Sequence, residues 1–276
     1  MSESSVEHIS WPECLIAFWD FRQAGPVFAP TIGRPGAGAL RVVGGNPRKT
    51  ADGPFGHALA FDGRSDALAV PVDQIGPLNA GASGDEVSVL AWVKRMPSSY
   101  CHFIAGIWVE NDNAPKRQYG LFVDLPAYGG ADRVCGHISR SGGPSPGLPF
   151  SRDYSASHRS VPFHEWHLVG FTYDGERAIS YLDGTSDFFP EYTEPGPPLG
   201  IGLTYSKNPY RTPSGQDDAG LNNTPAEFTV GFVELTSGPG NHFAGSIGGV
   251  AVFDRALTDN QILGLAQATI SLGASR

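Results

Sequence analysis

Short stretches with apolar residues at every second position recur along the chain, and this period of two predicts β-strands. The clearest stretch is 87–94, where Val87, Val89, Ala91 and Val93 alternate with other side chains. Comparable strand-like stretches lie at 15–21, 40–43, 57–61, 67–72, 103–109, 119–123, 134–138, 166–173, 177–182, 228–235 and 246–253. The pattern therefore predicts about a dozen short strands, as in an all-β protein.

Two Asp-Gly pairs predict how some of these strands connect. Asp174-Gly175 separates 166–173 from 177–182, and Asp62-Gly63 lies between 57–61 and 67–72. Asp-Gly favours the tight turns of β-hairpins because glycine accepts a positive φ. We therefore expect a hairpin at each position.

One short helix is predicted at the C-terminal end. Thr258 is followed three residues later by Gln261, which is the spacing of a capping box, and apolar residues follow. Gly273 is the expected stop. Strands alone elsewhere exclude a parallel α/β sheet, so the fold class is a two-sheet antiparallel sandwich with one short C-terminal helix.

The order of these signals favours one domain. Residues 1–14 form a tail, and 15–270 form a single unit interrupted by Gly- and Pro-rich insertions near 139–163 and 185–226. Insertions of this length are often functional. Phe150, Tyr154 and other loop aromatics predict that these insertions pack on the sheet.

The net charge, the length of the apolar runs and the N-terminal residues indicate which partners and which location to expect. The chain has a formal net charge of −9 and lacks the basic face that nucleic-acid binding needs. Its apolar runs are strand-length, so we expect no membrane insertion. Residues 1–14 lack the basic start and apolar core of a signal peptide. Localisation therefore stays open between the cytoplasm and, if a leader was removed, the exterior.

Seven segments occur in the order found in a known family, at 15–21, 55–66, 87–94, 119–122, 166–175, 181–184 and 243–262. They include LIAFWDF, WHLVGFTYDG and FAGSIGGVAVFDRALTDNQI. In this ordered set the chain resembles the concanavalin A-like lectin and glucanase superfamily, and within it the laminin-G-like jelly-roll domains. The resemblance implies a jelly roll that binds or cleaves a poly- or oligosaccharide on its concave face.

Calcium enters through the same resemblance. Family members with calcium often carry acidic residues where this chain has Gly248-Gly249. The remaining oxygen ligands are Asp20, Asp62 and Asp66, which could hold calcium if it is bound. The protein is therefore expected to need no cofactor, with calcium as an option.

Strand alternation selects a candidate binding face. In 134–140, Val134 and Ile138 should face the core, which leaves His137 on the other face. If 118–124 and 133–139 form a hairpin, Gly120 lies opposite His137 and opens space above the imidazole. The expected exposed patch also contains residues from neighbouring strands and strand ends: Trp108, Glu110, Arg117, Gln118, Ser139 and Arg140.

Two functions fit this patch. The leading hypothesis is a lectin-like binder of a poly- or oligosaccharide. The alternative is a polysaccharide lyase or another glycan-cleaving enzyme. In a lyase, His137 would be the base, Gln118 or an arginine such as Arg140 would neutralise a uronate carboxylate, and Tyr154 or Tyr119 would be the acid. A third, less informative interpretation is an adhesion or scaffold domain that contacts protein.

Other enzyme signatures are weak. The paired carboxylates that retaining glucanases carry on one strand as Glu-x-Asp-x-x-Glu do not occur. His164 and His167, three residues apart around the start of the predicted strand 166–173, do not suit a metal pair. A glycan-cleaving enzyme would therefore depend on His137.

Overall fold

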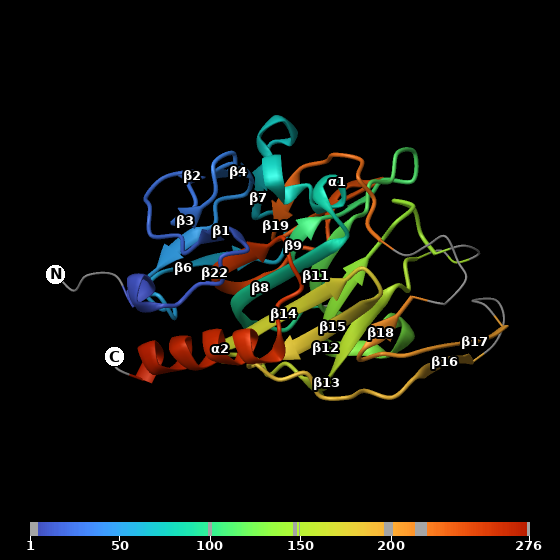
Figure 1. Cartoon of the computed structure of the whole chain (residues 1–276). Helices are drawn as coiled ribbons and strands as arrows, with labels where there is room; N and C mark the ends of the chain where they lie inside the picture. Colours follow the sequence, from blue (N-terminus) through green and yellow to red (C-terminus); the bar gives the residue numbers. More distant parts are fainter. Residues whose placement is uncertain are drawn as a thin grey trace.

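The alternating stretches form a sandwich of two antiparallel sheets, which confirms the fold class (Figure 1). The computed structural model describes residues 5–98, 101–145, 148, 150–195, 201–212 and 220–274, with backbone alone for 5, 194–195, 201–205 and 270–274.

Nine strands of the described chain form the first sheet. Its order is β18-β15-β14-β8-β22-β1-β3, and β6 pairs with β22 and carries β5. The bounds are β1 Leu15–Trp19, β3 Ile32–Gly33, β5 Arg48–Thr50, β6 Ala58–Asp62, β8 Glu86–Arg95, β14 His167–Asp174, β15 Arg177–Leu182, β18 Tyr210–Arg211 and β22 Ala244–Phe253.

Eight strands of the described chain form the second sheet, in the order β13-β12-β11-β9-β19-β7-β4-β2. The bounds are β2 Val27–Phe28, β4 Leu40–Gly44, β7 Ala67–Val70, β9 His102–Ile107, β11 Tyr119–Leu125, β12 Gly130–Ile138, β13 Tyr154–Ser160 and β19 Phe228–Val230.

Smaller elements lie around the sandwich. β10 (Val109–Glu110) pairs in parallel with β20 (Val233–Leu235), which pairs with β21 (Gly238–Gly240). β16 (Tyr192–Pro195) and β17 (Ile201–Tyr205) extend to the right in Figure 1. The short helices are η1 Ser5–His8, η2 Val72–Gln74, η3 Gly76–Leu78, α1 Ala80–Ser83 and η4 Ala127–Gly129.

Two hydrophobic clusters share the nine-stranded sheet. Val89 and Val93 of β8 face the second sheet in the main core, whereas Leu90 and Trp92 face outward into a separate cluster. Helix α2 (Asp259–Ala274) covers that outer cluster and runs along the side of the sandwich in Figure 1. Helix α2 therefore shields part of the outer face of this sheet from solvent.

The predicted capping box starts α2. The backbone N–H of Thr258 donates to Gln261 Oε1 (2.9 Å), and the backbone N–H of Gln261 donates to Thr258 Oγ1 (3.3 Å). Gly273 lies inside the helix rather than ending it. No helix among the described residues is long and apolar enough to cross a membrane.

One predicted hairpin is confirmed and the other is wrong. β14 and β15 pair directly around Asp174-Gly175. β6 and β7 instead lie in different sheets, so the chain crosses between the sheets at Asp62-Gly63. Asp62 accepts the backbone N–H groups of Arg64, Ser65 and Asp66 and thereby closes a local turn. The Asp-Gly signal identified the turn but not the partner strands.

The two insertions contain strands that the sequence pattern did not indicate. β13 lies inside 139–163 and forms the edge of the eight-stranded sheet beside β12. β16, β17 and β18 lie inside 185–226. Polar residues at 157–160 interrupt the apolar alternation in β13, which hides it from a period-two search.

Candidate functional site

His137 faces away from the sandwich core, as alternation predicts. Its neighbour Gly136 faces inward, where a Cβ atom would lie 2.3 Å from Phe171 of the opposite sheet. Gly120 pairs with His137 across β11 and β12. The predicted register and the predicted face are therefore both confirmed.

The space above Gly120 is filled rather than open. A Cβ atom there would lie 3.0 to 3.4 Å from the rings of Phe122, Phe103 and Trp108. Phe103 also lies on this outer face, because a register shift between Leu121 and Phe122 pairs it with Phe122, whereas strict alternation along 103–109 would turn it to the core. The glycine therefore makes room for aromatic side chains of the protein itself.

Trp108 and His137 are buried, which corrects the expectation that this patch is exposed. Their side chains are 1% and 4% exposed. The His137 ring stacks on Tyr154 at 4.6 Å between centroids and meets the Trp108 ring edge-on at 4.9 Å. Alternation predicts which face a residue occupies, but not which loops cover that face.

The covering loops leave a pocket of about 430 Å³ over His137. Its aromatic walls come from Phe122 on β11, Tyr128 in η4, Tyr154 on β13 and Phe150 just before β13. Phe150 is the exposed wall, with 55% of its surface accessible. The remaining lining residues are Cys101, Glu110, Leu125, Pro126, Ala127, Ser151, Leu235 and Asn241.

Two buried polar atoms in this lining lack a hydrogen-bond partner among the described residues. They are Nδ1 of His137 and Oγ of Ser151. A buried polar group without a partner costs free energy, so such groups call for an explanation such as a ligand or an ordered water. Both atoms belong to the same pocket, which makes it the candidate functional site.

The pocket holds His137 in its neutral form. Burial lowers the pKa of His137 well below its usual 6.5, and the positive charges of Lys207 and Arg117 lower it further. Lys207 is itself buried, with its ammonium nitrogen 3.7 Å from the centre of the Tyr154 ring, and burial lowers the pKa of Lys207 to about 6. In a neutral imidazole, Nδ1 can either accept a hydrogen bond from a ligand or donate one to it, depending on the tautomer.

Glu110 supplies the carboxylate of the pocket. Trp108 Nε1 donates to Glu110 Oε1 at 2.7 Å, and Arg117 Nη2 lies 4.0 Å from Glu110 Oε2. The Glu110 side chain keeps a quarter of its surface exposed. Trp108 and Arg117 therefore orient Glu110 from behind rather than lining the pocket.

The other predicted site residues lie elsewhere. Gln118 donates to Asn79 Oδ1 (2.7 Å) and to the Thr224 carbonyl (3.0 Å), so its amide N–H groups serve loop packing. Ser139 accepts the Gly142 N–H. Arg140 is exposed and does not line the pocket. Of the predicted residues, Glu110, His137 and Tyr154 come together in the lining.

The Tyr154 hydroxyl is already engaged. It donates to the carbonyl oxygens of Ala127 and Tyr128, which lie 2.5 and 3.0 Å away. This bond fixes η4 over the sheet and shapes one wall of the pocket. Tyr128 and Ser151 were not predicted from the sequence; an aromatic residue in the hairpin loop before Gly129-Gly130 was the available signal for Tyr128.

The three aspartates proposed for calcium do not form one ligand set. Asp20 accepts bonds from Arg22 and Thr31, whereas Asp66 accepts the backbone N–H groups of Asn46 and Asp62. Within the described part of the chain, no three His, Cys, Asp or Glu side chains group closely enough to hold a metal ion. The described residues therefore do not bring Asp20, Asp62 and Asp66 together as one calcium site.

Comparison with known proteins relates the fold to solved structures. No protein-family model matches the sequence, and no curated protein matches it. Domain 4 of an extracellular arabinanase from Geobacillus stearothermophilus, solved with arabinotriose, is similar at 18% identity and a TM-score of 0.57. The match covers 92% of this chain and 98% of that domain.

Two further solved structures are similar over part of their length. Trypanosoma rangeli sialidase, in complex with sialic acid, shares 14% identity at a TM-score of 0.57, over 95% of this chain and 34% of the sialidase. The receptor-binding domain of a botulinum neurotoxin C/D mosaic shares 11% at a TM-score of 0.53, over 94% of this chain and 52% of the other. At these identities the likeness concerns the fold alone.

Proposed function

We propose that the protein binds a poly- or oligosaccharide, with a sugar residue in the pocket over His137. The observation that carries this proposal is the combination of aromatic walls with the unpartnered His137 Nδ1 and Ser151 Oγ. Sugars offer apolar C–H faces to aromatic rings and hydroxyl groups to polar atoms. Small-molecule sites combine the same two elements, a mostly apolar lining and a few convergent polar groups.

The similar structures support the sugar assignment by analogy of fold. The arabinanase domain was solved with arabinotriose and the sialidase with sialic acid. Fold alone does not determine function, so the pocket remains the main argument. The finer assignment to the concanavalin A-like, laminin-G-like type belongs to the same proposal and depends on the ordered sequence segments.

A glycan array followed by calorimetry on the strongest hit tests the proposal. Phe150→Ala removes an exposed wall of the pocket, and we expect the affinity to fall about tenfold or more. Phe188→Ala is the matched control, because Phe188 is also exposed but lies outside the pocket. Equal affinities for these two variants, or an array without hits, would refute a sugar site over His137.

Ser151→Ala tests the polar half of the site. Loss of a ligand hydrogen bond should weaken binding by about 0.5 to 1.5 kcal/mol. If the hydroxyl bonds no ligand, its removal leaves the affinity unchanged or raises the stability of the free protein.

A second candidate function is β-elimination on an acidic polysaccharide, favoured by one observation. His137 is held neutral, which is the form that a general base requires. Two partners are less suited, because Gln118 bonds to Asn79 and the Tyr154 hydroxyl bonds to backbone. An absorbance assay for unsaturated uronates on pectate, alginate and hyaluronan decides between binding alone and cleavage.

A further inference from the structure

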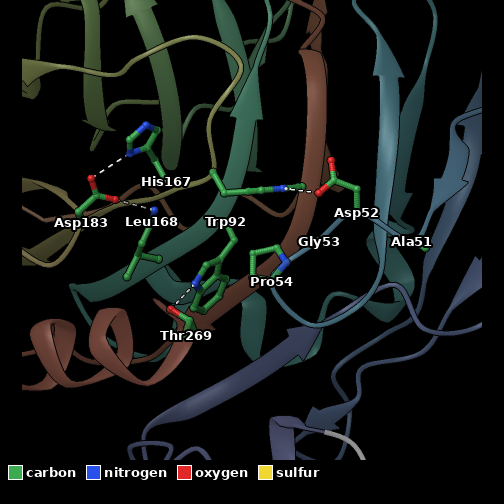
Figure 2. A pocket seen from close by; sticks show the side chains of 10 residues that line it. Ala51, Asp52, Gly53, Pro54, Trp92, His167, Leu168, Asp183 and Thr269 are labelled. Carbon is green, nitrogen blue, oxygen red and sulfur yellow. Dashed lines mark hydrogen bonds and ion pairs between the residues drawn. The ribbon is translucent and has the colours of Figure 1, made fainter. Parts of the chain in front are cut away.

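A second pocket, of about 420 Å³, opens on the outer face of the nine-stranded sheet beside the end of α2 (Figure 2). Its described lining shares no residue with the pocket over His137. Trp92 on β8 and Leu168 on β14 form an apolar floor, and Thr269 of α2 borders them. Because Trp92 Nε1 donates to Thr269 Oγ1 at 2.9 Å, Trp92 offers only its ring.

Trp166 is held in place at this pocket. Its Nε1 donates to Asp52 Oδ1 at 3.1 Å, and the Lys94 ammonium lies 5.4 Å from its ring centre. Lys94 also pairs with Asp52. The half-buried indole is thus fixed before any ligand arrives, which lowers the entropy cost of binding.

Gly248 gives Trp166 its position. A Cβ atom at Gly248 would lie 2.6 Å from Pro54 Cδ and 3.3 Å from Trp166 Cζ3. Any larger residue would therefore displace the indole or the loop that carries Pro54. Calcium-binding members of the family that the sequence resembles often carry an acidic residue at this position. Here the glycine instead leaves the space that the Trp166 ring occupies.

Two carboxylates provide acceptors at opposite sides of the platform. Asp183 receives the Leu168 N–H at 3.1 Å and bonds His167 Nδ1 at 2.9 Å, as Figure 2 shows. Asp52 faces it across the pocket and keeps 62% of its side chain exposed. Each carboxylate oxygen retains a free lone pair for a ligand hydroxyl.

We propose that this pocket is a second carbohydrate site, which takes a neutral sugar residue. The sugar packs a C–H face on Trp166 and donates hydroxyl hydrogen bonds to Asp52 and Asp183. These two carboxylates outnumber the single ammonium of Lys94, so the site discriminates against uronates and sialic acids. Since the two pockets lie on opposite faces of the sandwich, the protein can hold two glycan chains at once.

Fluorine NMR of protein labelled with 5-fluorotryptophan reads both pockets separately. The chain has five tryptophans, and single Trp→Phe variants assign their resonances. Trp166 reports on the second pocket, and Trp108, which contacts His137 and Glu110, reports on the first. The probes are arabinotriose and cellotriose as neutral sugars and trigalacturonate as a charged one, each up to 10 mM as an order-of-magnitude ceiling for weak sites.

The expected result is a saturable shift of the Trp166 resonance with at least one neutral probe and none with trigalacturonate. Asp52→Asn should weaken this response about tenfold, and Asp187→Asn, at an exposed carboxylate outside the pocket, should leave it unchanged. Phe150→Ala should not affect it. Melting curves check that each variant is folded.

Three results would overturn the second site: no saturable Trp166 shift with either neutral probe, an equal response to trigalacturonate, or loss of the response in Phe150→Ala. Failure of the first site looks different, because Trp108 would stay silent while Trp166 responds. Each proposal is therefore tested by its own resonance, Trp108 for the first pocket and Trp166 for the second.

Discussion

Acidification below pH 6.5 should destabilise the protein through two buried histidines. Burial lowers the pKa of His102 from 6.5 to about 4, and the pKa of His137 lies well below 6.5. In the unfolded chain both imidazoles return to their ordinary pKa, so the unfolded state binds more protons below pH 6.5. By linkage, the free energy of unfolding then falls as the pH falls.

The magnitude follows from the number of protons taken up on unfolding. At pH 5.5 each unfolded histidine holds about 0.9 proton, whereas folded His102, with a pKa of about 4, holds almost none. One proton corresponds to about 1.4 kcal/mol per pH unit, so His102 alone contributes a slope of about 1.2 kcal/mol per unit, and His137 adds a contribution of the same sign. Lys207, whose pKa falls from 10.5 to about 6, adds its own loss mainly between pH 10.5 and 6.

Urea unfolding at pH 5.0, 5.5 and 6.0 measures this slope. His102→Phe keeps a flat ring against Phe243, whose centroid lies 5.4 Å away, and removes one titrating group. The slope of the variant should be smaller than that of the wild type by about 1.2 kcal/mol per unit, whatever its absolute stability. A wild-type slope near zero, or an unchanged slope in the variant, would refute the burial argument.

Three further predictions concern the stability of the fold. Gly136→Ala should cost about 1 to 3 kcal/mol in urea unfolding, because the new Cβ would lie 2.3 Å from Phe171; an unchanged midpoint would mean that the sheets can separate there. Asp62→Ala should cost about 1 kcal/mol or more, since three backbone N–H groups lose their acceptor, and a neutral result in thermal unfolding would contradict that role. A chelator should leave the melting temperature unchanged, because Asp20 and Asp66 already bond within the protein; a drop of many degrees would reveal a bound metal.

The fold was largely readable from the sequence because strand periodicity is a local property. Valines and alanine of 87–93 point inward, and the capping box at Thr258 begins α2 as predicted. Pairing across long distances was less readable. Asp62-Gly63 looks like a hairpin turn, yet β6 and β7 belong to different sheets, because local turn chemistry does not encode the partner of a strand.

The candidate site was predictable only in part. Alternation and one hairpin place His137 opposite Gly120, and this pairing is confirmed. The bulge that turns Phe103 outward, and the loops that bring Phe150 over His137, depend on tertiary packing. The second pocket was not predictable from sequence patterns, because His167 and its partner Asp183 lie on different segments that only the fold brings together.

The separate clusters on the two faces of β8 bear on how this protein can change over time. Val93 packs between the sheets, whereas Trp92, one residue earlier, packs outward near α2. Substitutions around one pocket therefore alter side chains that the other pocket does not touch, and distant sites usually behave additively. Selection, or a directed-evolution experiment, can therefore change the lining of one pocket while that of the other is conserved.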